Sequence, residues 1–277
     1  MIDSMIDDLV NFTADSTFME TITKTAADYD NLIYTNIVMK FMKDVSFGIG
    51  ASLLCLFMLM ELVAIVQRSD SGGGMHSLQI PANILIKWGI YTFLFCRLNV
   101  ILEGIQGVAV EMANNAAISG SAPNVALLQN ADNIKQTIKD LNLVEELFAD
   151  LIVMIVWLIF NLFKSLISVL MVFRMFELWI MIMFAPIPLA TLPAPEFRQT
   201  AINYIKSFAA LCLTGVIIIA SFMLFSNFVG HKIAAIPITA NFLVFAQNIL
   251  LILGYVSVLV VTVFNAGRIS KSIMNAM

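Results

Sequence analysis

The longest uninterrupted apolar stretch of the sequence places the strongest limit on the fold. From Leu147 to Phe184 the chain runs for 38 residues without a glycine or a proline. As one α-helix this stretch would be roughly 57 Å long, well beyond the roughly 30 Å hydrocarbon core of a bilayer. Lipid can surround such a helix because every backbone donor bonds within it. The stretch predicts either one helix that projects past the bilayer or two spans that meet at a bend near 161–168.

The composition extends this expectation to the whole chain. Of the 277 residues, 60% are hydrophobic and only 12% are charged, and the mean hydropathy is +0.91. Soluble domains carry about a quarter charged residues. We therefore predict an all-α, polytopic membrane helix bundle with five or six transmembrane helices over residues 45–277. The expected spans are Val45–Gln67, Ile84–Ala109, Leu147–Phe184 (one span or two), Ile202–Val229 and Asn241–Phe264.

Two less apolar segments accompany the predicted spans. Residues 1–44 are acidic, with apolar positions near helical spacing, so we expect an amphipathic segment there. A polar loop is expected at about 112–148. Lysines and arginines near the spans do not decide which side of the membrane each end faces, so the topology stays open.

A proline-rich segment follows the long apolar stretch. Pro186, Pro188, Pro193 and Pro195 lie within ten residues. Each lacks a backbone N–H, and each disfavours helical backbone in the residue before it. We expect a structured helix break at 185–196, at or near one membrane face, because non-helical backbone is not tolerated against lipid.

The region around this break resembles a known family. An Arg-x-x-Glu pattern at 174–177 on a long apolar helix is followed by APIPLATLP and then by NYIKSFAAL. This arrangement, over about Leu151–Ser221, resembles the polytopic inner-membrane subunit of conjugative type IV secretion systems, in the TrbL-like form of Gram-positive conjugative elements. The sequence departs from that family at Thr214-Gly215, where a glutamine before the glycine is expected.

The resemblance implies a function and a set of partners. It implies an oligomeric structural or channel component in the bacterial cytoplasmic membrane, surrounded by lipid, with several copies around or beside a path for a DNA–protein substrate. The implied partners are a cytoplasmic ATPase, a coupling protein and a wall-facing subunit.

Polar side chains inside the predicted spans are the candidate functional residues. A charge at such depth costs several kcal/mol, roughly, unless it is paired or hydrated. Asn99, Glu103 and Gln106 form one polar stripe at helical spacing in the second span. Arg174 and Glu177 are three residues apart, which is close enough for them to pair. These side chains could form charge pairs between helices or line a conducting path, and the sequence does not decide between the two roles. The candidates are Glu61, Arg97, Asn99, Glu103, Gln106, Lys164, Arg174 and Glu177.

Small residues mark a candidate packing seam. Ser207, Thr214 and Ser221 recur every seven residues, with Gly215 beside them. Small and hydroxyl-bearing residues let membrane helices approach closely. The glycines at 48 and 50 predict the same property at the start of the first span.

The sequence contains no recognisable catalytic motif. A Walker-type loop, an HExxH and a GxSxG are all lacking. His76, His231 and the three cysteines, Cys55, Cys96 and Cys212, have no metal-ligand spacing. We therefore expect no enzyme activity, no catalytic residue, no metal and no cofactor.

Two other classes of function stay open. A stand-alone secondary transporter or small channel also uses proline-broken helices and intramembrane charges, although such proteins commonly show two related halves, which this sequence lacks. A non-conducting assembly scaffold is the other alternative.

Overall fold

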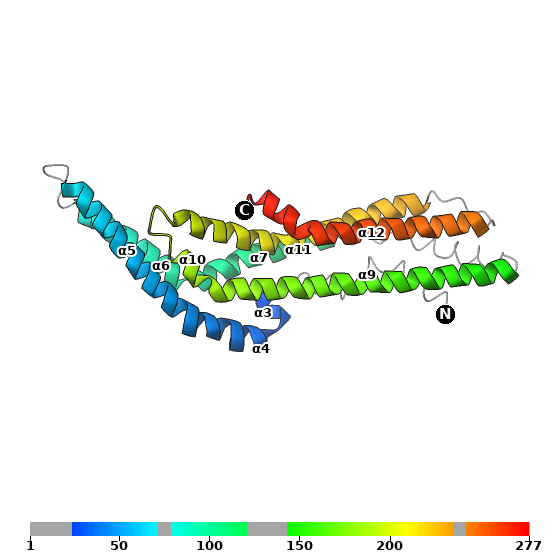
Figure 1. Ribbon diagram of the computed structural model, residues 1–277, viewed down its shortest axis with the longest axis horizontal. Coiled ribbons are helices and arrows are strands. Elements are labelled where there is room, and N and C mark those ends of the chain that lie inside the picture. The colour runs from blue at the N-terminus through cyan, green and yellow to red at the C-terminus, as the bar shows by residue number, and fades with distance from the viewer. Residues whose placement is uncertain (1–23, 71–78, 121–142, 235–241, 277) are drawn as a thin grey trace. The chain divides into compact units, whose positions relative to one another are not determined.

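The computed structural model describes residues 24–70, 79–120, 143–234 and 242–276. Every regular element in these ranges is helical, which confirms the predicted fold class (Figure 1). Five helices are long: α5 (Phe47–Asp70), α7 (Leu98–Gly120), α9 (Leu143–Phe184), α11 (Arg198–Ala234) and α12 (Phe242–Ile273). The others are α3 (Ala26–Tyr29), α4 (Asn31–Ile33), the π-helical η2 (Tyr34–Met39) and η3 (Met42–Ser46), α6 (Gln79–Cys96) and α10 (Pro186–Leu189).

The described helices are sufficient for several membrane crossings. Four are long and apolar enough to cross a bilayer, or five if a bent pair counts as one span. The four lie at Asn31–Gln67, Leu147–Phe184, Arg198–Phe225 and Leu253–Ile273, and the bent pair joins Ile84–Cys96 to Leu98–Ala116. The chain is therefore a multi-pass membrane protein.

The long apolar stretch forms one helix. α9 continues without a break from Leu143 to Phe184, so the alternative with a bend near residues 161–168 is not formed. Asn161, the polar residue at the expected bend, donates its side-chain amide to the carbonyl of Trp157 at 2.9 Å within the same helix. A side chain satisfied in this way leaves the helical backbone intact.

The predicted second span is divided by a bend that the sequence analysis did not anticipate. The axes of α6 and α7 differ by 62° at Arg97, although neither a proline nor a glycine lies there. Packing on the two sides of the bend explains it. Before the bend, Phe95 is buried with Leu54 and Met58 of α5. Beyond it, Leu98 and Leu102 join a core formed with α9 and α11.

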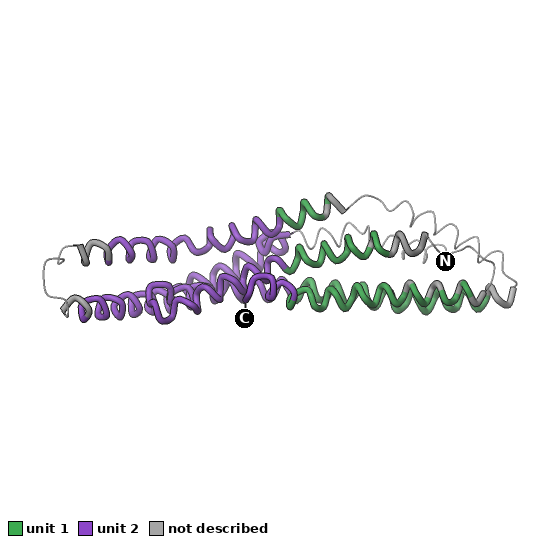
Figure 2. The backbone as a smooth tube through the Cα atoms, turned by 90° about the horizontal axis from the view of Figure 1, so that it is seen from above, with its two compact units in different colours: residues 1–23, 111–173, 214–268 green, residues 24–110, 174–213, 269–277 purple. Residues whose placement is uncertain are grey.

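The chain divides into two compact units (Figure 2). In the described ranges, one unit contains residues 111–173 and 214–268. Its core comes from α7, α9, α11 and α12, and includes Phe160, Ile167, Ile219, Phe222 and Leu259. The other unit contains residues 24–110, 174–213 and 269–277 and holds the proline-rich segment.

Helical structure continues through the end of the expected N-terminal segment. Residues 1–23 lie outside the described residues, as does most of the expected polar loop. The side chains of Thr25 and Asp30 cap α3 and α4 by accepting backbone N–H bonds of 3.1 and 3.0 Å. The expected boundary at residue 44 falls inside η3 (Met42–Ser46).

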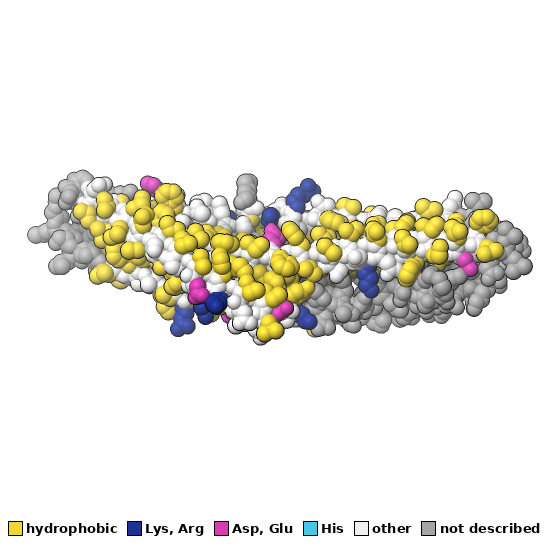
Figure 3. All heavy atoms as spheres, turned by 60° about the horizontal axis from the view of Figure 1, so that its bottom comes forward, with side chains coloured by type: hydrophobic (Ala, Val, Ile, Leu, Met, Phe, Trp, Pro, Cys, Tyr) yellow, Lys and Arg dark blue, Asp and Glu magenta, His cyan; other side chains and the backbone are white. Residues whose placement is uncertain are grey.

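Large apolar side chains are exposed along the described helices (Figure 3). Such a surface is unsuited to water and suited to lipid or to other membrane helices. Examples are Leu59, Phe93, Leu158, Val169 and Leu224.

Candidate functional site

The proline-rich segment interrupts the helical chain. α9 ends at Phe184 and α11 begins at Arg198, with only the four-residue α10 between them. Pro186 and Pro193 are buried, Pro188 is half-buried and Pro195 is exposed. The interruption coincides with the four prolines. The residues before Pro186 and Pro188 are nonetheless helical, in contrast to the expectation: Ala185 has φ −53° and ψ −39°, and Ile187 lies within α10.

One face of α5 packs against this break. Buried residues recur along the helix at spacings of three or four: Ser46 just before α5, then Gly50, Leu54, Met58 and Glu61. A methyl group at Gly50 would come within 2.8 Å of the Pro186 carbonyl oxygen and within 2.9 Å of Phe95 Cζ. Nothing lies within 4 Å of such a group at Gly48. Of the two glycines the sequence analysis singled out, Gly50 is therefore the one that permits a close approach.

Arg198 joins α6 to the end of the break. Its Nη2 donates to the hydroxyl of Tyr91 at 3.1 Å, and its Nε donates to the carbonyl of Leu192 at 3.3 Å. Beside it, the rings of Phe57 on α5 and Phe197 lie 5.3 Å apart. The break is thus contacted by both helices of the α5–α6 hairpin.

Glu61 is held inside this hairpin. Its Oε1 lies 3.6 Å from Nζ of Lys87, and the Glu61 side chain is 6% exposed whereas that of Lys87 is 53% exposed. The other oxygen, Oε2, is buried without a hydrogen-bond partner among the described residues. Glu61, one of the polar candidates in the predicted spans, therefore faces the interior of the hairpin.

Arg174 bonds to the backbone of a neighbouring helix. Its Nε donates to the carbonyl of Leu211 at 3.3 Å and its Nη2 donates to the carbonyl of Cys212 at 3.0 Å. Glu177 is half-buried on the same helix, and no ion pair joins it to Arg174 among the described residues. The guanidinium therefore joins α9 to α11 rather than neutralising its neighbour.

The three polar residues expected to form one stripe on α7 lie in different surroundings. Gln106 is buried, Asn99 is half-buried and Glu103 is exposed. The carboxylate of Glu103 lies near the hydroxyl of Tyr34 in η2. Arg97 is exposed at the bend between α6 and α7. These residues do not converge on one polar surface.

The remaining candidates lie on α9 and α11. Lys164 is half-buried in α9. In the predicted seam, Ser207 is half-buried, whereas Thr214, Gly215 and Ser221 are buried. The hydroxyl of Ser221 donates to the carbonyl of Ile217 at 2.8 Å, so this hydrogen bond lies within α11 itself.

Several contacts that hold the proline-containing unit together were not found from the sequence. Trp179 donates its Nε1–H to the carbonyl of Ala26 at 3.0 Å and so attaches α3 to α9. The hydroxyls of Tyr204 and Ser270 donate to the carbonyls of Met181 and Ala210. Each donor is a polar group that needs a hydrogen-bond partner when it is buried, and in Trp179 and Tyr204 this group lies at the end of an apolar ring. A backbone carbonyl carries no side-chain signal, so the partner could not be named.

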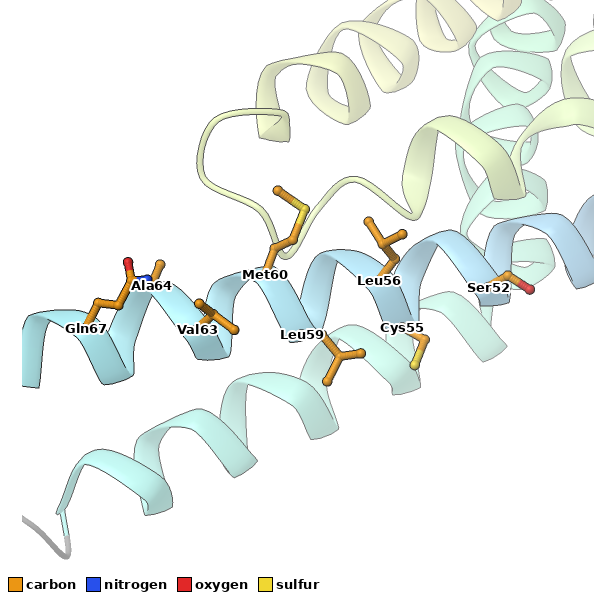
Figure 4. A pocket seen from close by; sticks show the side chains of 8 residues that line it. All are labelled: Ser52, Cys55, Leu56, Leu59, Met60, Val63, Ala64 and Gln67. Atoms are coloured by element: carbon orange, nitrogen blue, oxygen red, sulfur yellow. The ribbon is translucent and has the colours of Figure 1, made fainter.

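The spaces in this region are apolar. A cavity of about 30 Å³ lies between the bend and the break, lined by residues such as Leu98, Leu102, Leu189 and Ile205. A second hollow, about 610 Å³ and open, follows the exposed face of α5 from Ser52 to Gln67 (Figure 4). No group of three or more metal-ligating side chains occurs within the described ranges.

These features define a class: a polytopic membrane protein in which a broken helix is packed against a helical hairpin. The chain matches the family described as TrbL/VirB6 plasmid conjugal transfer like protein over residues 12–186, well over half of its length, and it belongs to this family. No curated protein and no solved structure matches it. The matched range and the resemblance at Leu151–Ser221 overlap up to the first proline of the break.

Proposed function

We propose that this protein is an integral-membrane structural or channel component of a type IV secretion machine for conjugative DNA transfer. The observation that carries the proposal is the family match, found on a chain with four or five helices able to cross a membrane. We place the protein in the bacterial cytoplasmic membrane. Work for transport comes from other subunits in this proposal, because the sequence offers no nucleotide-binding loop.

We further propose that several copies act together. The large exposed apolar side chains on α5, α9 and α12 support contact with lipid or with other membrane helices. Partners would be the other conjugal transfer subunits: a cytoplasmic ATPase, a coupling protein and a wall-facing subunit. The transported material would be a DNA–protein substrate.

A conjugating host tests this proposal. Deleting the gene should abolish transfer, and supplying the full chain in trans should restore it. The tagged chain, extracted in mild detergent, should bring down the ATPase, the coupling protein and the wall-facing subunit. Transfer that persists without the chain, or purification with none of these partners, would contradict the proposal.

A stand-alone transporter or small channel is the second candidate. The proline-broken helix and the buried Glu61 favour it, because secondary transporters build binding sites from broken helices and intramembrane charges. Liposomes containing only the purified chain separate the two candidates. Robust solute uptake would favour the transporter, and uptake no faster than in empty liposomes would favour the secretion component.

A scaffold without a pore is the third candidate. Glu103→Ala and Arg174→Ala, measured for both complex assembly and DNA transfer, distinguish a structural from a conducting role. Loss of assembly would indicate that the residue stabilises the complex. Normal assembly with lost transfer would indicate a role in conduction.

A further inference from the structure

The proline-rich segment makes fewer internal hydrogen bonds than a continuous helix of its length. Four of its residues have no backbone N–H. The bonds that remain include Ala190 N–H to the Pro186 carbonyl at 3.1 Å, and Thr191 N–H to the Pro188 carbonyl and Leu192 N–H to the Leu189 carbonyl, both at 3.3 Å. An α-helix of the same length would form a continuous ladder. The shape of this segment must therefore depend on what packs against it.

The hairpin of α5 and α6 supplies that packing. Ala190, at the end of α10, is fully buried in a cluster with Leu54 and Met58 of α5 and Phe95 of α6. Gly50 brings the α5 backbone directly onto Pro186, with no room for a Cβ. This approach is closer than ordinary side-chain packing, because a Cβ atom essentially never comes within 3.0 Å of a backbone oxygen.

We propose that Gly50 is the joint through which the α5–α6 hairpin sets the shape of the proline break, so that the two form one cooperative unit. In this arrangement a displacement of the hairpin is transmitted to the break and to the adjoining ends of α9 and α11.

Gly50→Ala and Gly48→Ala form a matched pair that tests the joint. Both changes bring the same gain in helix propensity to α5, and both add one methyl group. At Gly50 the methyl group meets Pro186 and Phe95, whereas at Gly48 it meets open space. The difference between the variants therefore isolates the contact with the break.

Hydrogen exchange of the full chain in lipid nanodiscs, followed by mass spectrometry, gives the readout. We expect amides in residues 185–197 to exchange about tenfold faster in Gly50→Ala than in Gly48→Ala, because overpacking at the joint favours local opening. The amides of residues 147–173, which belong to the other compact unit, should be unaffected. Equal exchange of residues 185–197 in the two alanine variants would overturn the proposal.

Phe95→Ala tests the same joint without adding volume. It removes a ring that is buried with Ala190 and that adjoins Gly50, so the hairpin should hold the break less firmly. We expect about tenfold faster exchange in residues 185–197 than in the unaltered chain. An unchanged rate would count against the proposal even if Gly50→Ala did not accumulate.

Discussion

At the scale of single residues, Arg174 shows how a charge is accommodated in an apolar bundle. Its guanidinium serves two backbone carbonyls at once, those of Leu211 and Cys212. We expect Arg174→Lys to lower the free energy of unfolding by about 2 kcal/mol, because an ammonium cannot reach both acceptors yet still carries the buried charge. Arg174→Met removes the charge together with its desolvation penalty, so it should cost less than about 1 kcal/mol.

Unfolding in mixed micelles, followed by circular dichroism, measures both variants of Arg174. Glu177→Gln is the control on the same helix and should change the free energy of unfolding by less than about 0.5 kcal/mol. A lysine variant as stable as the unaltered chain would show that the pair of hydrogen bonds contributes nothing.

Trp179 gives a second prediction at this scale. Trp179→Phe keeps an aromatic ring but removes the Nε1–H that bonds to the carbonyl of Ala26. We expect a loss of about 1–2 kcal/mol and faster hydrogen exchange in residues 24–30. Trp157→Phe is the matched control, because the Trp157 Nε1 has no partner among the described residues. Equal effects of the two substitutions would contradict a role for the hydrogen bond.

At the scale of elements, the α5–α6 hairpin contains a charge pair with unequal burial. Lys87→Met leaves the carboxylate of Glu61 buried without its counter-charge and should destabilise the hairpin by about 1–2 kcal/mol. Glu61→Gln leaves a half-exposed lysine that water can solvate, so it should destabilise the hairpin less than Lys87→Met does. The double variant should recover most of the loss caused by Lys87→Met. A double-mutant cycle in mixed micelles checks this, and strictly additive effects would show that the pair is not coupled.

At the scale of the whole molecule, the bent pair α6–α7 decides the topology. A bend of 62° keeps the second segment advancing in the direction of the first, whereas a re-entrant loop must turn back. The two apolar segments are roughly 20 and 28 Å long, so together they advance roughly 33 Å along the first axis, about the thickness of the hydrocarbon core. We therefore expect one broken span, so that the described helices cross the membrane five times and the two termini lie on opposite sides.

Reporter fusions test this topology. A cytoplasmic reporter and a reporter active only outside the cytoplasm, fused in turn to each terminus, should give opposite results at the two ends. Fusions that place both termini on the same side would indicate four crossings, with α6 and α7 forming a re-entrant loop.

The helical bundle and the position of the break could be predicted from the sequence because their causes are local. An apolar run of sufficient length stays helical in lipid whatever surrounds it. The missing N–H group of Pro186 accounts for the end of α9 at Phe184 without help from other segments. The resemblance rested on this local pattern, and the family match supports it over a longer range of the chain.

The partners of individual residues depended on the tertiary structure. Gly48 and Gly50 are equivalent in the sequence, but only Gly50 meets Pro186. Arg174 lies three residues from a carboxylate and instead bonds to carbonyls some 37 and 38 positions along the chain. The bend at Arg97 has no local cause and follows from packing into two separate cores. Sequence alone determined that the chain folds as helices in lipid and where one helix must break. The tertiary structure decided which faces meet, because that depends on packing between segments far apart in the chain.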